Sequence, residues 1–217
     1  MTGAAVPPRR PLGPRDRMVR SAAQLIRRKG VSGMGMREVV AHADSPRGSL
    51  QHYFPGGKDQ LVGEALLWMG GVAGRQVGRV LESLSSPSPG DLFAGIVATW
   101  RTHFLSEGFE AGCPLIAAAA DVAATSDGLR GVISRAFEGW QEPLAAALQE
   151  TGVPEERAPA LAIVVISALE GAIVLARIRQ DVAPLDVIVD ELAPVLDAAV
   201  PARRRPDKNA EAARRRR

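Results

Sequence analysis

The sequence contains little cysteine, few aromatic residues and no long apolar run, and each shortage excludes a class of protein. Cys113 is the single cysteine among 217 residues, so an intramolecular disulfide cannot form. Residues 1–20 contain no apolar run of signal-peptide length. The most apolar stretch, residues 160–176, carries Glu170 and is short for a bilayer span. We therefore expect a cytoplasmic protein with no membrane partner, in which this stretch forms a buried helix.

Strands are difficult to place anywhere in the chain. Phe, Trp and Tyr amount to 4% of the residues, and alternating β-branched patterns are scarce. Ala, Leu, Arg and Glu recur instead at a spacing of three to four residues, which is typical of amphipathic helices. The sequence therefore predicts an all-α fold, and its length is sufficient for a sizeable core.

Catalytic and metal-binding motifs are also missing. His42, His52 and His103 do not have metal-ligand spacing, and the chain contains no H-E-x-x-H, G-x-S-x-G or phosphate-cradling glycine loop. Catalysis by Cys113 would require His103 beside it in space, which the sequence alone does not establish. We therefore expect no enzyme activity, no catalytic residue, no metal site and no cofactor.

Charge is distributed unevenly along the chain. Residues 1–60 contain 11 Lys and Arg against 4 Asp and Glu, residues 61–200 contain 8 against 18, and residues 201–217 contain 8 against 2. A basic N-terminal segment followed by an acidic body suggests a module that binds a polyanion, joined to a body with another role. The alternative is that charge is merely uneven.

The N-terminal part divides into an arm and a series of helices. Prolines and the lack of periodicity predict a flexible arm over residues 1–14. A basic helix follows, with Gly30 as its C-terminal stop. A short helix from Met36 to Ala43 comes next, and Ser45-Pro46 is a natural start for another. Two short helices separated by about three residues are typical of a helix-turn-helix, whose second helix enters the major groove of DNA.

The polar side chains of that second helix are of the types that groove entry requires. Arg47 can reach a phosphate or a guanine edge, and Gln51 can pair with adenine. Ser49, His52 and Tyr53 can donate to phosphate oxygens, while Gly48 allows close approach of the backbone. Lys58 then opens a further helix, and a lysine at a helix N-terminus favours phosphate binding. The alternative is a solvated helix face in which Tyr53 and Phe54 belong to the core.

These residues resemble the TetR family of one-component bacterial transcriptional regulators. The resemblance is carried by AHADSPRGSLQHYFPGGKDQL, residues 41–61, and by the basic helix before it. HYFPGGKDQL, together with GCPLIAAAA from Gly112, is similar to the subgroup of lincomycin- and flavonoid-responsive repressors. The resemblance implies that Leu50 and Phe54 hold the head together and that DNA is contacted by Arg37, Arg47, Ser49, Gln51, Tyr53 and Lys58.

The second half is predicted to be a helical body. Helices are expected at residues 90–106, 113–124, 126–151, 155–180 and 185–200, after a loop at residues 85–89. The family resemblance implies that this body encloses a pocket of roughly 300 to 1,000 Å³ for a small hydrophobic effector. Its candidate lining residues are Trp68, Trp100, His103, Phe104, Cys113, Phe137, Trp140 and Glu170. The alternative for each aromatic residue is plain core packing.

The helix expected at residues 155–180 is apolar around most of its circumference. It is either the central helix of its domain or is shared with a second subunit, as in the four-helix dimer interface of the family. The next helix has an apolar stripe that would complete this interface. The candidate interface residues are Ile163, Ser167, Gly171, Val174, Ile188, Leu192 and Val195.

The predicted organisation is an arm at residues 1–14, a DNA-binding head at 15–74, an effector-binding and dimerisation domain at 75–200, and a disordered basic tail at 201–217. The tail either adds nonspecific phosphate affinity or only improves solubility. We expect a homodimeric regulator that binds a palindromic operator in double-stranded DNA and is released by a small effector, acting as a repressor. The alternative is a helical protein that sequesters a hydrophobic compound without operator control.

Overall fold

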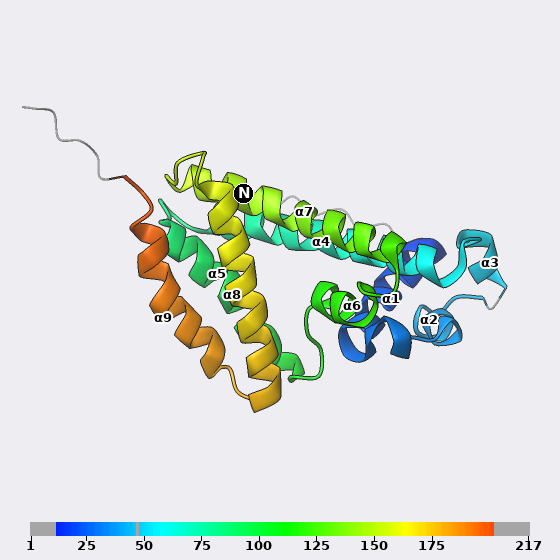
Figure 1. Ribbon diagram of the computed structural model, residues 1–217. Coiled ribbons are helices and arrows are strands. Elements are labelled where there is room, and N and C mark those ends of the chain that lie inside the picture. The colour runs from blue at the N-terminus through cyan, green and yellow to red at the C-terminus, as the bar shows by residue number, and fades with distance from the viewer. Residues whose placement is uncertain (1–11, 47, 202–217) are drawn as a thin grey trace, which may run out of the picture.

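Helices form wherever the sequence places apolar residues at three- to four-residue spacing. The computed structural model describes residues 12–46 and 48–201, and within these ranges all regular structure is helical, which confirms the all-α prediction. Most of the arm, Arg47 and the tail from residue 202 lie outside the described residues. The helices (Figure 1) are α1 (Pro14–Gly33), α2 (Met36–His42), α3 (Ser49–Tyr53), α4 (Gly57–Ser83), α5 (Pro89–Glu107), α6 (Pro114–Val122), α7 (Asp127–Glu150), α8 (Ala158–Arg179) and α9 (Ala183–Asp197).

Capping residues account for several helix ends. Ser88 and Asp91 form a capping box at the start of α5, and the Ser126 side chain accepts from the Leu129 amide at the start of α7. Gly30, expected to stop the first helix, has φ of 73° and interrupts α1, although one further helical turn follows it.

The second helix of the helix-turn-helix is shorter than the sequence suggests. Ser45-Pro46 was expected to open it, but α3 begins at Ser49 and contains 5 residues. Asp44 has φ of 46°, and the Ser45 hydroxyl donates to the Ala43 carbonyl at 3.2 Å. The predicted N-cap, Ser45, therefore lies in the segment between α2 and α3, and Gly48 is the residue at the start of α3.

The head is held together by apolar packing and by hydrogen bonds that Arg17 donates. Met18 of α1, Val39 of α2 and Phe54 after α3 are fully buried. The Arg17 guanidinium donates from Nε to the Ala43 carbonyl at 2.9 Å and from Nη2 to the Asp44 carbonyl at 3.0 Å. Carbonyls that α2 leaves unpaired at its end are thereby satisfied by α1, which fixes the turn before α3.

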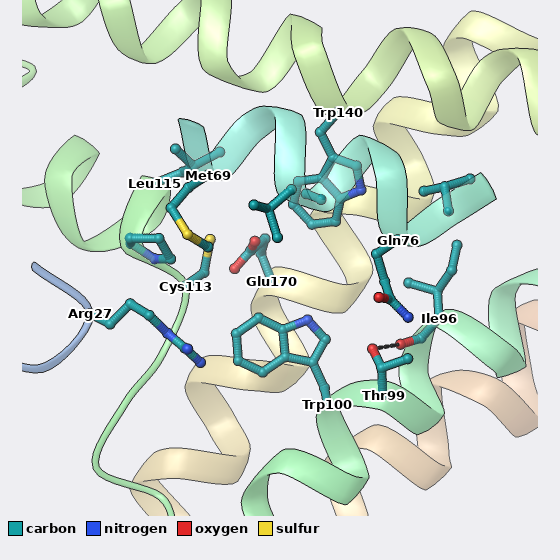
Figure 2. A pocket seen from close by; sticks show the side chains of 14 residues that line it. Arg27, Met69, Gln76, Ile96, Thr99, Trp100, Cys113, Leu115, Trp140 and Glu170 are labelled. Atoms are coloured by element: carbon teal, nitrogen blue, oxygen red, sulfur yellow. Dashed lines mark hydrogen bonds between the residues drawn. The ribbon is translucent and has the colours of Figure 1, made fainter. Parts of the chain in front are cut away.

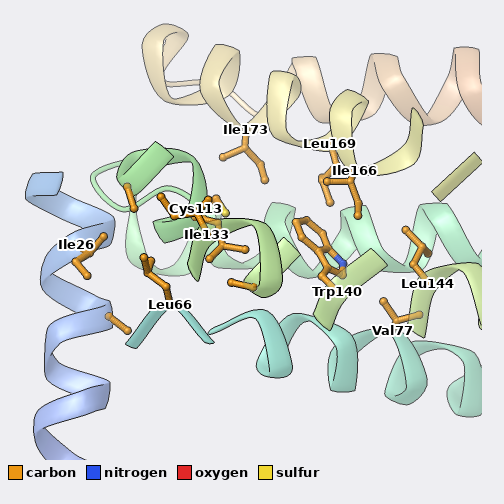
Figure 3. Packing of buried hydrophobic residues seen from close by; sticks show 14 of the residues in the cluster. Ile26, Leu66, Val77, Cys113, Ile133, Trp140, Leu144, Ile166, Leu169 and Ile173 are labelled. Atoms are coloured by element: carbon orange, nitrogen blue, oxygen red, sulfur yellow. The ribbon is translucent and has the colours of Figure 1, made fainter. Parts of the chain in front are cut away.

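A long helix joins the head to the body. Helix α4 begins in the head and runs along α7, its most extensive partner (Figure 1). The two backbones come close at Gly70, where an added Cβ would lie 2.1 Å from the Ala136 carbonyl oxygen. The predicted boundary between residues 74 and 75 therefore falls inside a helix that belongs to both parts. Figure 3 shows the core between α1, α4, α7 and α8, which includes Ile26, Leu66, Trp140 and Leu169.

Helix α8 is buried on one side and exposed on the other. By length and composition it could cross a membrane, with a mean hydropathy of 2.2, yet it packs against α7 and α9 and 44% of its most apolar window is buried. Its outward side exposes Ile163, Val174 and Ile178, and α9 exposes Val195 beside it. An apolar surface shared by two adjacent helices marks an interaction site more often than a solvated face.

Candidate functional site

The outer surface of the head carries the polar residues that the sequence singles out for DNA contact. Gln51 and His52 of α3, Gly48 before it and Arg37 of α2 are exposed, and Tyr53 is half-buried against the core. The rings of His52 and Tyr53 meet edge to face, with centroids 4.9 Å apart. Arg47, which belongs to the same predicted set, lies outside the described residues.

Two other members of this set have neighbours in the structure. The Ser49 hydroxyl donates to the Pro46 carbonyl at 2.6 Å, so it would have to rotate before it could donate to a phosphate. Lys58 lies in the first turn of α4, which has no side-chain cap on its amides. The Gly57 amide donates to the Phe54 carbonyl and the Gly56 amide to Gln60 Oε1, so Lys58 is the group at this helix start that attracts phosphate.

The body contains an apolar cavity of about 190 Å³ between the head and the far end of the bundle. Its volume lies below the expected range of roughly 300 to 1,000 Å³. Figure 2 shows its lining, which comes from α1, α4, α5, α7, α8 and the start of α6. The lining residues are Arg27, Met69, Val72, Ala73, Gln76, Val77, Ile96, Thr99, Trp100, Cys113, Pro114, Leu115, Trp140 and Glu170.

Four of the eight predicted pocket residues line this cavity: Trp100, Cys113, Trp140 and Glu170. The other four lie elsewhere. Phe104 is fully buried and stacks on Phe109 with centroids 5.0 Å apart. Trp68 lies under the Arg20 guanidinium at 5.3 Å on the outside of the bundle, and Phe137 packs against the core without lining the cavity. The His103 ring meets the Trp100 ring edge to face, with centroids 5.7 Å apart, and its Nε2 contacts Arg27.

Glu170 is the most unusual residue of the cavity. Its side chain is 4% exposed, and neither carboxyl oxygen has a hydrogen-bond partner among the described residues. Burial raises the pKa of this carboxyl to about 7, while an interaction with the Cys113 thiol offsets part of the effect. A buried carboxyl without a partner costs stability, and such groups are concentrated at sites that bind something.

Cys113 does not have the properties of a nucleophile. It is buried, and burial together with the neighbouring Glu170 carboxylate raises the pKa of its thiol well above the ordinary value. Reactive cysteines have a lowered pKa and are partly exposed. Over residues 12–46 and 48–201, no group of three or more His, Cys, Asp and Glu side chains could hold a metal ion.

Arg27 connects the first helix of the head to the cavity wall. Its Nε donates to the Gly112 carbonyl at 2.8 Å, and its guanidinium lies 5.5 Å from the Trp100 ring centroid. Its Nη2 donates to His103 Nε2 at 2.9 Å; burial and the Arg27 charge lower the pKa of His103, which favours the neutral ring that can accept. The sequence places Arg27 only as a cation in the last turn of a helix, and its contacts with the cavity were missed.

A second link between head and body lies at the end of α6. Asp121 accepts from the Ser32 amide at 2.5 Å and from the Ser32 hydroxyl at 2.7 Å. On the other side of the loop that precedes α6, Arg177 of α8 donates to the carbonyls of Phe109 and Glu110. Helix α6 and its preceding loop are therefore held by both the head and helix α8.

Family models match both halves of the chain. Residues 19–65 match the model of bacterial regulatory proteins of the tetR family, and residues 89–191 match the LmrA/YxaF-like C-terminal domain of transcriptional regulators. An uncharacterised HTH-type transcriptional regulator of Mycobacterium tuberculosis is 39% identical over 198 residues, covering 89% of this chain and 99% of its own length. The HTH-type regulator YxaF of Bacillus subtilis is 30% identical over 182 residues, covering 84% and 94%.

Solved structures share the fold. The reduced form of Escherichia coli NemR superposes with a TM-score of 0.70 at 22% identity, covering 82% of this chain and 94% of that one. A TetR regulatory protein of Rhodobacter sphaeroides gives 0.71 at 22% identity, covering 82% and 96%. The sequence matches and the fold agree with the resemblance found in the head and in the second half. The chain belongs to the TetR family of helix-turn-helix transcriptional regulators, with a C-terminal domain of the LmrA/YxaF-like type and no enzymatic role.

Proposed function

We propose that this protein is a cytoplasmic, homodimeric repressor that binds a palindromic operator and releases it when a small hydrophobic effector fills the body cavity. The observation that carries this proposal is that the cavity wall includes Arg27 of the head's own first helix. Whatever changes the shape of the cavity therefore acts directly on the part of the molecule that contacts DNA.

The exposed surface of α3 supports the DNA-binding half of the proposal. Gln51 and His52 project from a short helix that is thin enough for the major groove, while Phe54 behind them is fully buried. Because Phe54 anchors this segment in the core, α3 can contact DNA through Gln51 and His52 while the head stays folded. Gln51 is assigned to base contact and Lys58 to phosphate contact.

The path from cavity to head runs through two helices. Helix α4 contributes Met69, Ala73 and Gln76 to the cavity and begins at Gly57, beside α3. Helix α1 contributes Arg27 and contacts α6 through Ser32 and Asp121. An effector that binds one arrangement of these helices more tightly shifts the population toward it, and the separation of the two α3 helices changes with it.

The apolar side of α8 and α9 supports the dimer. Of the seven predicted interface residues, Ile163, Ser167, Gly171, Val174 and Val195 are exposed, and Ile188 and Leu192 are half-buried. Space is open around the position that a Cβ would occupy on Gly171, so a partner helix can approach closely there. A dimer would cover these residues and place two α3 helices about 34 to 36 Å apart, one turn of DNA.

DNase footprinting of the DNA upstream of the gene tests this proposal. We expect two protected half-sites related by two-fold symmetry and centred about 10 base pairs or a multiple of that apart. Gln51→Ala should lose the footprint at concentrations where wild type protects fully, whereas substitution of the exposed Glu142 by Gln should not. Uniform coating of all DNA would contradict operator recognition.

Sequestration of a hydrophobic compound without operator control is the alternative function. The presence of the cavity favours neither account, since both require it. The alternative predicts a ligand-binding protein whose affinity for operator and random DNA is equal. The exposed side chains on α3 favour the regulator.

A further inference from the structure

The cavity contains a buried carboxyl, Glu170, for which the described residues supply no counter-charge. Both Glu170 oxygens are buried and lack a hydrogen-bond partner within the described residues. In Figure 2 the carboxyl projects among the lining side chains, with Trp140 and Trp100 on either side in this view. Buried carboxylates are ordinarily paired or hydrogen-bonded, so this arrangement leaves a donor or a cation to be supplied from outside.

Arg27 is a cation in the same lining, but its contacts are made elsewhere. Its Nε and Nη2 are directed at the Gly112 carbonyl and at His103, and its guanidinium lies over Trp100. No ion pair joins Arg27 to Glu170 in the described structure, and the neighbour that interacts with the carboxyl is the Cys113 thiol. A thiol is only a weak donor, so the carboxyl remains without a counter-charge.

Two indole rings share the cavity with this carboxyl. Trp140 is 4% exposed and Trp100 is half-buried, and both line the same space. Aromatic faces attract organic cations as well as apolar groups, and the attraction increases in a site from which water is excluded. The remaining lining is apolar apart from Arg27, Gln76, Thr99 and Cys113.

We propose that the effector is a lipophilic amine whose ammonium group pairs with the Glu170 carboxylate while its apolar body packs on Trp100 and Trp140. This inference rests on the proposed function and specifies the chemistry of its effector. The volume of about 190 Å³ restricts the ligand to a compact body of one or two rings with a short side arm. An anionic ligand would be repelled by Glu170, and a neutral one would leave the carboxylate without a counter-charge.

Matched sets of small probes test the assignment. Phenethylamine, phenethyl alcohol and phenylacetate share one ring and differ in charge, as do tryptamine, tryptophol and indoleacetate. Calorimetry on the full-length protein at pH 8, where Glu170 with its pKa of about 7 is ionised, measures their affinities. We expect an amine to bind about tenfold or more tightly than its alcohol, the gain typical of a charge-assisted hydrogen bond, and the carboxylates to bind weakest.

Two variants and a control separate recognition from folding. Glu170→Gln keeps the shape and should reduce amine affinity to that of the alcohol. Trp100→Leu should weaken amine binding more than alcohol binding, because it removes a face that attracts the cation. Glu142→Gln, an exposed carboxylate on α7, should leave all affinities unchanged. Circular dichroism of each variant establishes that it is folded.

The proposal is overturned if alcohols or carboxylates bind wild type as tightly as amines, if Glu170→Gln retains the preference, or if no amine of either ring size binds. Operator binding measured without ligand keeps the two proposals apart. If only a neutral or anionic compound released a bound operator, the proposal of an amine effector would be refuted and the proposal of a repressor would stand. Absence of operator binding would refute the repressor even if amines bind.

Discussion

Gln51 and Lys58 differ in what each can read on DNA, although both lie on the surface of the head. Gln51 is exposed on α3, where its amide can form two hydrogen bonds with adenine. Gln51→Ala should therefore change the preference for one operator base pair by about 1 to 3 kcal/mol. Lys58→Ala should weaken binding to all sequences alike and reduce the dependence of affinity on salt. Anisotropy titrations with single-base operator variants measure both effects; equal losses on operator and random DNA for Gln51→Ala would remove it from base recognition.

Glu170 makes the stability of the protein depend on pH. Its folded-state pKa is about 7 against a usual value of 4.5, so the folded protein holds this proton more tightly than the unfolded chain. The folded state therefore loses stability as pH rises from about 4.5 to 7, and the full cost is present above 7. The shift corresponds to a cost on the order of 3 kcal/mol, because each pKa unit is worth about 1.4 kcal/mol.

Urea denaturation of Glu170→Gln and wild type at pH 5 and pH 8 tests this expectation. The free energy of unfolding of the variant should exceed that of wild type at pH 8, and the difference should be much smaller at pH 5. Of the other charged or titratable cavity residues, the Cys113 thiol stays protonated because burial raises its pKa, and Arg27 stays charged. A difference between the two proteins that is equal at both pH values would contradict the account.

At the scale of the elements, Arg27 joins helix α1 to the loop before α6, a contact between distant parts of the chain. Arg27→Ala removes the hydrogen bond to Gly112, 85 residues away, and the cover over Trp100. We expect a loss of about 1 to 3 kcal/mol in the free energy of unfolding, as for a partly buried hydrogen bond of a charged group. Amide exchange over residues 108–113 should also become faster. Arg28→Ala, at an exposed neighbouring position, is the control, and equal effects of the two changes would refute this role.

Local sequence patterns predict where helices form more accurately than they predict helix ends or tertiary contacts. Amphipathic spacing predicted α5, α7, α8 and α9 to within a few residues, since each helix needs only an apolar face and a cap. The predicted start of α3 at Ser45 was wrong. Asp44 takes a left-handed conformation there, and Arg17 of α1 donates a hydrogen bond to its carbonyl. The sequence of residues 41–50 gives no indication of this contact, because Arg17 lies more than 20 residues earlier in the chain.

The cavity shows the same limit. The sequence suggested eight lining residues, five of them aromatic, and the structure brings four of the eight together. Only two of the five aromatic residues line the cavity, because a helix directs successive side chains to different sides. Trp68 therefore faces Arg20 outside the bundle, although it lies one residue before Met69, which lines the cavity. Arg27 was missed because its role depends on the loop at Gly112, far away in sequence.

At the scale of the whole molecule, the apolar surface of α8 and α9 predicts a dimer. Ile163 is 53% exposed, so Ile163→Glu should not disturb the fold of one chain but would place a charge inside a subunit interface. Light scattering should give wild type twice the mass of one chain and the variant the mass of one. Leu67→Glu, at an exposed position on α4, is the control. A variant that stays dimeric would move the interface elsewhere.

The central claim is that the whole molecule recognises a particular DNA sequence through its head. Fluorescence anisotropy of the purified protein on DNA from beside its own gene, with random DNA as the control and a salt series, tests it most directly. The account predicts tight binding to the first DNA alone, with affinity that falls steeply as salt rises. Equal and weak binding to both DNAs would contradict it and would leave the ligand-sequestering protein as the better account.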